Sequence, residues 1–231
     1  MILWLRSALF LLWFLFITTI LSLIFLPVLL LPRMATVWLA RLWSRSTFWG
    51  LKVFAGIGFE VRGAAPKGAA LVASKHMSMW DTLALYLALN SPAIVLKRSL
   101  LYIPFYGWFL WKATAIAIDR GAGAGALRKM SAAAQKVLDE GRPILIFPEG
   151  TRKKPHAPPD YKPGVAGLYA LSKVPCVPVA LNSGVYWTGF IKKPGTIVLE
   201  FLEPIAPGLK REAFMALLES RIETATSRLL P

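Results

Sequence analysis

The sequence predicts an α/β protein: a mostly parallel sheet flanked by helices, preceded by an N-terminal membrane-embedded helical segment. Residues 7–32 contain no charged side chain, and from residue 60 onward short apolar runs of strand length alternate with helical stretches. Strands that alternate with helices are typical of a parallel sheet covered on both faces. We therefore expect membrane-anchoring apolar and interfacial helices over residues 1–58 and an α/β domain over residues 59–231.

The charge-free segment is long enough for a membrane. A helix over residues 7–32 rises about 1.5 Å per residue, enough to cross or deeply enter a bilayer core of about 30 Å. Pro27 and Pro32 bend or end that helix near its C-terminal end. The sequence leaves open whether the segment spans the bilayer or forms one arm of a helical hairpin. The strongly apolar segment that follows favours the hairpin.

The next segment, residues 33–54, interleaves Trp and Phe with basic residues, and no acidic residue precedes residue 60. This pattern is typical of a helix in the membrane interface, where cations reach the headgroups and aromatic rings lie at the boundary. The positive-inside rule places the chain after residue 32 on the cytoplasmic face. The basic residues are Arg33, Arg41, Arg45 and Lys52.

The composition points to the same kind of partner. The chain has 27 Lys and Arg against 12 Asp and Glu, a formal net charge of +15, and is 56% hydrophobic. A basic protein suits nucleic acid or an anionic membrane surface. The apolar N-terminus favours the membrane, and the sequence carries no nucleic-acid-binding motif.

Two histidines and one cysteine build no typical metal site. The lone cysteine, Cys176, forms no intramolecular disulfide, and we interpret it as packing in a buried strand.

Within the α/β domain, residues 127–141 carry apolar side chains at helical spacing and end at Gly141 as a C-cap. A final amphipathic helix follows over residues 212–230. The run GAGAGA at 121–126 lacks the lysine of a P-loop and the spacing of a dinucleotide motif, so we interpret it as a flexible connection into the helix at 127. The predicted strands are residues 70–74, 113–118, 143–147 and 177–181.

Polar residues gather just past the carboxyl ends of three predicted strands. His76 follows the first strand, Asp119 and Arg120 follow the second, and Glu149 to Arg152 follow the third. In open α/β sheets, ligands bind at that edge. We expect these three segments, which are far apart in the sequence, to converge on one crevice.

His76 and Asp81 form a candidate catalytic pair. Five positions along an ideal helix turn through about 500°, so the two side chains meet only if His76 lies in the loop and Asp81 in the first helical turn. Ser78 as N-cap with Asp81 at N3 would be a variant of the capping box. The imidazole would then donate one ring N–H to Asp81 and keep its other nitrogen as a proton acceptor. The alternative is that Asp81 only caps the helix and His76 is an ordinary loop residue.

The segment FPEGTR, residues 147–152, suits an anionic ligand. Pro148 ends the strand as a paired central strand, and Gly150 allows a tight turn and close approach of the backbone to a ligand. The guanidinium fork of Arg152 matches a phosphate. The alternative is a structural ion pair between Glu149 and Arg152.

Four blocks in this order carry a family resemblance: H-x-x-x-x-D at 76–81, I-D-R at 118–120, F-P-E-G-T-R at 147–152 and V-P-V-A at 177–180. Together they resemble the glycerolipid acyltransferases of the 1-acyl-sn-glycerol-3-phosphate acyltransferase type, over roughly residues 60 to 205. The chain departs from this pattern at Lys75, where many members have Asn.

The resemblance implies roles for individual residues. It implies that His76 is the general base on the acceptor hydroxyl and that Asp81 orients it. The V-P-V-A block is implicated on the acyl-donor side and in shaping the site. The residues implied to bind the substrate's phosphate region are Lys97, Arg120, Glu149, Gly150, Thr151 and Arg152.

The function implied is that of a membrane-bound O-acyltransferase whose acyltransferase domain covers residues 59–231. It would transfer a fatty acyl group from acyl-CoA or acyl carrier protein to the sn-2 hydroxyl of 1-acyl-sn-glycerol 3-phosphate, giving phosphatidate. The partners would be the lysophospholipid, the thioester donor and the membrane, with no further cofactor, no metal and no nucleic acid. We expect a bacterial inner membrane, with the catalytic domain on the cytoplasmic side.

Three alternatives stay open at this point. The first is acyl transfer to another acceptor, such as glycerol 3-phosphate or a lyso-ornithine lipid. The second is a thioester or lipid hydrolase in which His76 activates water. The third is a non-catalytic lipid-binding membrane protein.

Overall fold

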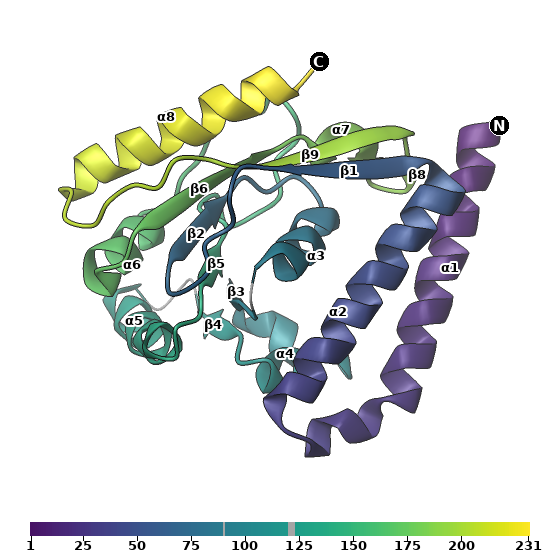
Figure 1. Ribbon diagram of the computed structural model, residues 1–231, viewed down its shortest axis with the longest axis horizontal. Coiled ribbons are helices and arrows are strands. Elements are labelled where there is room, and N and C mark those ends of the chain that lie inside the picture. The colour runs from purple at the N-terminus through teal and green to yellow at the C-terminus, as the bar shows by residue number, and fades with distance from the viewer. Residues whose placement is uncertain (90, 120–122) are drawn as a thin grey trace.

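The computed structural model describes residues 1–89, 91–119 and 123–231. Figure 1 shows a helical hairpin at the N-terminus, packed against one side of a twisted sheet that has further helices on its other side. The predicted α/β class, with a mostly parallel sheet between helices, is confirmed, and an apolar N-terminal helix is present.

The hairpin consists of α1 (Ile2–Ile24), the short 3-10 helix η1 (Leu26–Leu30) and α2 (Arg33–Gly50), which continues as the π-helical η2 (Leu51–Ala55). Pro27 lies in the first turn of η1, and Pro32 is the N-cap of α2. The prolines therefore end α1 and reverse the chain. As a result α1 and α2 lie side by side in Figure 1.

Indole N–H groups join the two arms of the hairpin. Trp13 Nε1 donates to the carbonyl oxygen of Ser46 at 2.9 Å, and Trp43 Nε1 donates to Thr18 Oγ1 at 2.9 Å. Near the first of these, a Cβ on Gly50 would lie 2.1 Å from Trp13 Cδ1, so only glycine lets the two helices approach this closely.

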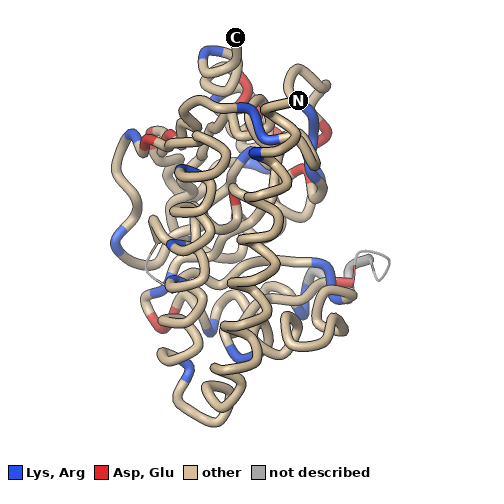
Figure 2. The backbone as a smooth tube through the Cα atoms, turned by 90° about the vertical axis from the view of Figure 1, so that its right-hand side faces the viewer, with Lys and Arg blue, Asp and Glu red and all other residues tan. Residues whose placement is uncertain are grey.

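The outer face of α1 is apolar and exposed. α1 is long and apolar enough to cross a membrane, and only 17% of its most apolar window is buried inside the protein. Arg6 is its one charged residue. Figure 2 looks onto the hairpin and shows α1 as an almost uninterrupted uncharged segment.

The main sheet has seven strands in the order β1-β9-β6-β2-β5-β3-β4. All neighbouring pairs are parallel except β6 and β9. The four predicted strands correspond to β2, β4, β5 and β6, whereas β1, β3, β9 and a small hairpin of β7 and β8 were not predicted. The strands are β1 (Ile57–Arg62), β2 (Leu71–Ser74), β3 (Ala93–Lys97), β4 (Ile116–Ile118), β5 (Ile144–Ile146), β6 (Cys176–Leu181), β7 (Trp187–Thr188), β8 (Ile191–Lys192) and β9 (Gly195–Phe201).

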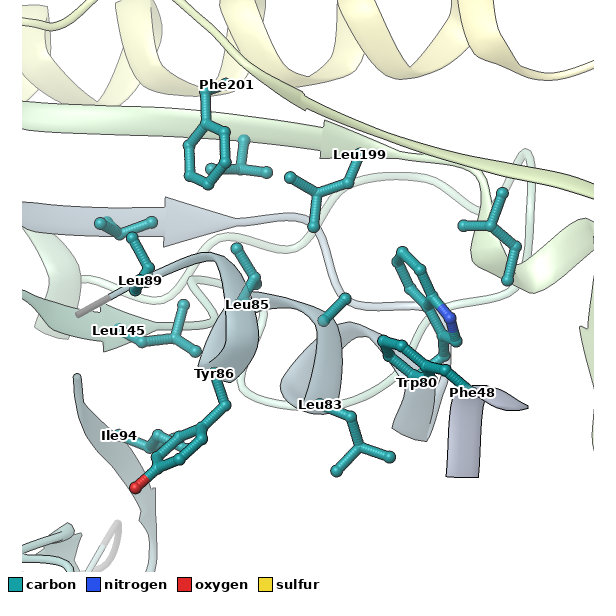
Figure 3. Packing of buried hydrophobic residues seen from close by; sticks show 14 of the residues in the cluster. Phe48, Trp80, Leu83, Leu85, Tyr86, Leu89, Ile94, Leu145, Leu199 and Phe201 are labelled. Atoms are coloured by element: carbon teal, nitrogen blue, oxygen red, sulfur yellow. The ribbon is translucent and has the colours of Figure 1, made fainter. Parts of the chain in front are cut away.

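Helices cover both faces of this sheet and bury one apolar cluster on each. On the hairpin side, α3 packs between the hairpin and the strands, with Leu85 and Leu89 near Leu145 of β5 (Figure 3). Trp80 stacks on Phe48 of α2 with ring centroids 5.4 Å apart. On the other face α5, α6 and α8 bury the second cluster. The remaining helices are α3 (Met79–Ala88), η3 (Arg98–Tyr102), α4 (Tyr106–Lys112), α5 (Gly123–Asp139), α6 (Gly164–Ser172), α7 (Ser183–Tyr186) and α8 (Arg211–Leu229).

The glycine-rich run is the main local correction. Helix α5 already begins at Gly123, so residues 123–126 are helical and not a flexible connection. Alanine has the highest helix propensity of all residues, which offsets the cost of the intervening glycines. Residues 121 and 122 of the predicted connection lie outside the described residues. The C-terminal end agrees with the prediction, because Gly141 follows α5 with a φ of +70°.

Candidate functional site

The His76–Asp81 pair forms in the way its spacing predicts. β2 ends at Ser74, His76 lies in the loop, and α3 starts at Met79. Ser78 is the N-cap and Asp81 is at N3, with both halves of a capping box present. The loop turns the imidazole back over the helix start, so that His76 Nδ1 lies 2.9 Å from Asp81 Oδ2.

The Asp81 carboxylate is fully buried and saturated with donors. Oδ2 accepts the backbone N–H groups of Met77 at 2.6 Å and Ser78 at 2.8 Å, besides His76. Oδ1 accepts from Ser78 Oγ at 3.2 Å and from Ser183 Oγ. A buried carboxylate is stable only with such partners. The backbone N–H groups and the serine hydroxyls together hold Oδ2 of Asp81 towards the imidazole of His76.

The His76 ring is held on a second side by an aromatic contact. It stacks on Phe147 with centroids 3.9 Å apart and an interplanar angle of 19°, and 12% of the side chain is exposed. Because an ionised carboxylate only accepts hydrogen bonds, Nδ1 carries the proton that faces Asp81. With that proton on Nδ1, the neutral form of the ring has Nε2 as an acceptor for a proton from a ligand.

Ser183 is a member of this site that the sequence interpretation missed. It lies two residues after the end of β6, at the start of α7, and is fully buried. The V-P-V-A block ends just before it, and a serine after a strand carries little signal of its own. Its position at the carboxyl end of β6, beside β2, was the available clue, because neighbouring parallel strands end at the same edge.

The FPEGTR segment lies against the His76 loop. β5 ends at Ile146, and the chain turns at Gly150, whose φ is +67° and whose N–H donates to the carbonyl of Phe147 at 2.9 Å. The N–H of Lys153 donates to the carbonyl of His76 at 2.8 Å. Thr151 and Arg152 are exposed beside this contact.

Glu149 does not form the ion pair with Arg152 that was the alternative prediction. Its side chain is 1% exposed, and Oε1 accepts from Lys75 Nζ at 2.9 Å. No described residue makes an ion pair with the Arg152 guanidinium. Desolvation by burial raises the pKa of Glu149, and the hydrogen bond from Lys75 opposes that shift.

Lys75, the departure from the family pattern, is at the centre of a buried charge cluster. Only 2% of its side chain is exposed, and Nζ also donates to Glu223 of α8 at 2.8 and 3.1 Å. The hydroxyl of Tyr161 donates to Glu223 at 2.8 Å. A buried ammonium requires such carboxylates. The cluster therefore ties the residue before His76 to the FPEGTR segment and to the C-terminal helix.

The predicted phosphate-binding residues fall into three groups. Arg152 and the turn around Gly150 follow β5, and Lys97 is the exposed last residue of the neighbouring parallel strand β3. These strands end at the same edge, so the two cations share it with His76. Arg120 lies outside the described residues.

The protein also contains an apolar cavity of about 140 Å³. Side chains of α1, α2, α3 and α4 line it, and on α3 it reaches Thr82, the residue after Asp81. His76 and Asp81 do not line this cavity, which lies between α3 and the helical hairpin. Among the described residues, no group of three or more His, Cys, Asp or Glu side chains is placed to hold a metal ion. Cys176 is buried in β6, as predicted, and burial raises its pKa.

Comparison with known proteins agrees with this arrangement. The family model described as "Acyltransferase" matches residues 58–182. The chain is 40% identical over 159 residues to the 1-acyl-sn-glycerol-3-phosphate acyltransferase of Pseudomonas aeruginosa, covering 67% of this chain and 62% of the relative. It is 32% identical over 180 residues to the 1-acyl-sn-glycerol-3-phosphate acyltransferase alpha of Mus musculus, covering 73% of this chain and 62% of that protein.

A solved structure has the same fold. The crystal structure of the 1-acyl-sn-glycerophosphate (LPA) acyltransferase PlsC from Thermotoga maritima matches with a TM-score of 0.77 and 21% identity, covering 97% of this chain and 96% of that one. The chain spans 62% of the length of both curated relatives. The family match covers more than half of the sequence, including both His76 and the FPEGTR segment. This chain belongs to the acyltransferase family.

Proposed function

We propose that this protein is a membrane-bound O-acyltransferase that acylates the sn-2 hydroxyl of 1-acyl-sn-glycerol 3-phosphate, giving phosphatidate. The observation that carries the proposal is the His76–Asp81 pair at the edge of the sheet. A histidine with one nitrogen bound by a buried carboxylate and the other available is the arrangement that general-base catalysis requires. The names of the relatives support this reaction and this acceptor.

The chemistry needs one proton transfer and no covalent enzyme intermediate. His76 Nε2 accepts the proton of the acceptor hydroxyl while its oxygen attacks the thioester carbonyl. Asp81 holds the ring and stabilises the imidazolium that forms. When the tetrahedral intermediate collapses, the C–S bond breaks and the proton leaves with the thiolate as a free thiol. The histidine returns to its neutral form.

The acceptor's phosphate would bind beside this pair. Arg152 is exposed next to the His76 loop and has no ion-pair partner among the described residues, so its guanidinium is available to a phosphate. Lys97 would supply a second positive charge at the same edge. We assign Gly150 and Thr151 to the backbone turn that brings Arg152 to the ligand, and Arg120 to the same site.

The hairpin and the donor complete the proposal. α1 would embed in the bilayer. The acyltransferase domain would lie on the cytoplasmic side of a bacterial inner membrane, since the basic residues of α2 follow α1 in the sequence.

The donor would be acyl-CoA or acyl-acyl carrier protein. The net charge of +15 suits either an acidic carrier protein or an anionic membrane.

Product identification tests the proposal. The full chain in mixed detergent micelles is given acyl-CoA or acyl carrier protein thioester with lysophosphatidate, glycerol 3-phosphate or lyso-ornithine lipid. We expect phosphatidate from lysophosphatidate as the main product. Free fatty acid without an acylated lipid would identify a hydrolase instead. Lipid binding without turnover under either donor would identify a non-catalytic protein.

A further inference from the structure

An exposed aromatic surface lies outside the catalytic pair and outside the helical hairpin. It is formed by η3, the corner that follows it, and α4, and we name it the η3–α4 surface. Its side chains are unusually open for their type: Tyr102 and Trp111 are each 72% exposed, Trp108 is 47% exposed and Ile103 is 44% exposed. Soluble proteins seldom present so much contiguous apolar area without a partner.

The corner between η3 and α4 holds these side chains in place. The N–H of Gly107 donates to the carbonyl of Ile103 at 2.8 Å, and a Cβ on Gly107 would lie 2.1 Å from the carbonyl oxygen of Leu101. Phe105, the N-cap of α4, has a φ of +61°. The close packing of this corner fixes the direction of α4. Trp108 and Trp111, three residues apart, therefore share one face of the helix.

The surface lies next to the hairpin. α4 contacts both α2 and η1, the turn of the hairpin, and Phe109 packs on the cluster of Leu21, Val28 and Leu39. Figure 1 shows α4 at the same end of the molecule as the connection between α1 and α2. A membrane at the turn of the hairpin would therefore lie close to the η3–α4 surface.

The charged residues within the η3–α4 surface are basic. Arg98 begins η3 and Lys112 ends α4. The sequence has no acidic residue between Asp81 and Asp119. Trp and Tyr flanked by Lys and Arg are characteristic of the boundary between bilayer and water, where the rings lie among the headgroups and the cations bind lipid phosphates.

We propose that the η3–α4 surface is a second membrane-contacting surface, which inserts Trp108, Trp111, Tyr102 and Ile103 at headgroup depth in an anionic bilayer. Arg98 and Lys112 bind lipid phosphates at its rim. The inference rests on the proposed membrane attachment of the hairpin and extends it to the α/β domain. The opposite side of α4, with Phe109 and Leu110, lines the apolar cavity. The surface therefore holds the wall of that cavity at the membrane, from which a lysophospholipid would arrive.

Spin labels measure the depth of this surface directly. The background is the full chain with Cys176→Ala, because that buried thiol is the one cysteine in the sequence. Single labels are placed by Trp111→Cys and Tyr102→Cys, with Leu209→Cys as the matched exposed control before α8. The protein is reconstituted in vesicles of phosphatidylcholine and phosphatidylglycerol. We expect labels at 111 and 102 to collide with oxygen and to be shielded from a water-soluble nickel complex, and the label at 209 to behave in the opposite way.

A charge variant tests the lipid partner. Lys112→Glu should reduce the depth at position 102 in vesicles that contain phosphatidylglycerol, and Arg211→Glu on α8 should not. Labels at 111 and 102 that are as open to nickel as the label at 209 would overturn the proposal. So would shielding that persists without lipid in a chain that sediments as a dimer, because a second copy would then cover the surface. Acyl transfer to detergent-dispersed lysophosphatidate is measured in parallel. If it is absent, the proposed function fails, whereas the depths still report on the surface.

Discussion

The hydroxyl of Ser183 donates a hydrogen bond to Oδ1 of Asp81, which lies 102 positions earlier in the chain. Both side chains are fully buried. Ser78 Oγ lies 2.9 Å from Ser183 Oγ and 3.2 Å from the same carboxylate oxygen. The two serines therefore fix the side of Asp81 that faces away from His76, and so determine which oxygen the imidazole meets.

Ser183→Ala should lower kcat with little change in either KM. A hydrogen bond to a charged group contributes about 1.5–3 kcal/mol, so the loss corresponds to roughly ten- to a hundredfold in rate, at ~1.4 kcal/mol per tenfold. Ser172→Ala is the control, because Ser172 is also buried and hydrogen-bonded, but on α6. If both variants lower thermal stability alike and leave kcat unchanged, Ser183 has only a packing role.

The buried cluster around Lys75 gives a stability prediction. Lys75→Met leaves Glu149 and Glu223 without their shared cation, and removing one partner of a buried ion pair costs roughly 3–5 kcal/mol. At about 2–4 °C per kcal/mol for a chain of this size, the melting temperature should fall by roughly 6–20 °C. The double variant Lys75→Met, Glu149→Gln should be more stable than Lys75→Met alone, because one uncompensated carboxylate is removed. Strictly additive losses would contradict the coupling.

Lys75 also shows how far the sequence could predict the site. The spacing of His76 and Asp81, with a serine at the N-cap, was enough to place the pair, because a capping box has local geometry. The partners of Lys75 and Asp81 come from α8 and α7. Such contacts depend on the order of strands in the sheet, which no local pattern encodes. The edge strand β1 escaped prediction because four of its six side chains are exposed, so that it has no continuous apolar run.

Arg152→Ala should raise KM for lysophosphatidate by roughly ten- to a hundredfold, the equivalent of about 1.5–3 kcal/mol for hydrogen bonds to a charged group. KM for the acyl donor should change much less. Arg152→Lys should recover part of the loss, since an ammonium offers no fork. Arg152 is exposed and makes no ion pair with any residue in the described ranges. The melting temperature of the Arg152→Ala variant should therefore stay near that of the wild type. Equal changes in both KM values would show that Arg152 does not bind the phosphate of lysophosphatidate.

Lys192 gives a pH dependence of stability. It is 5% exposed, its Nζ lies 4.7 Å from the centre of the Trp187 ring, and desolvation lowers its pKa to about 8. In the unfolded chain its pKa returns to about 10.4. Between these values the unfolded chain binds more protons, so this group makes stability rise as pH rises from 8 towards 10. The melting temperature of the wild type should therefore increase relative to Lys192→Met between pH 7 and pH 10. A difference that stays constant with pH would refute the assignment.

In the proposed reaction, His76, held by Asp81, removes the proton from the acceptor hydroxyl. This role is tested most directly by the rate of phosphatidate formation from lysophosphatidate and a thioester donor. The rate is compared between the wild type, His76→Ala and Asp81→Asn at matched folded concentration. Removing a general base costs about 10²–10⁴-fold, and we expect that loss of kcat in His76→Ala with KM for lysophosphatidate nearly unchanged. Asp81→Asn should fall in the same range. A His76→Ala protein that forms phosphatidate at close to the wild-type kcat would show that His76 is not the general base.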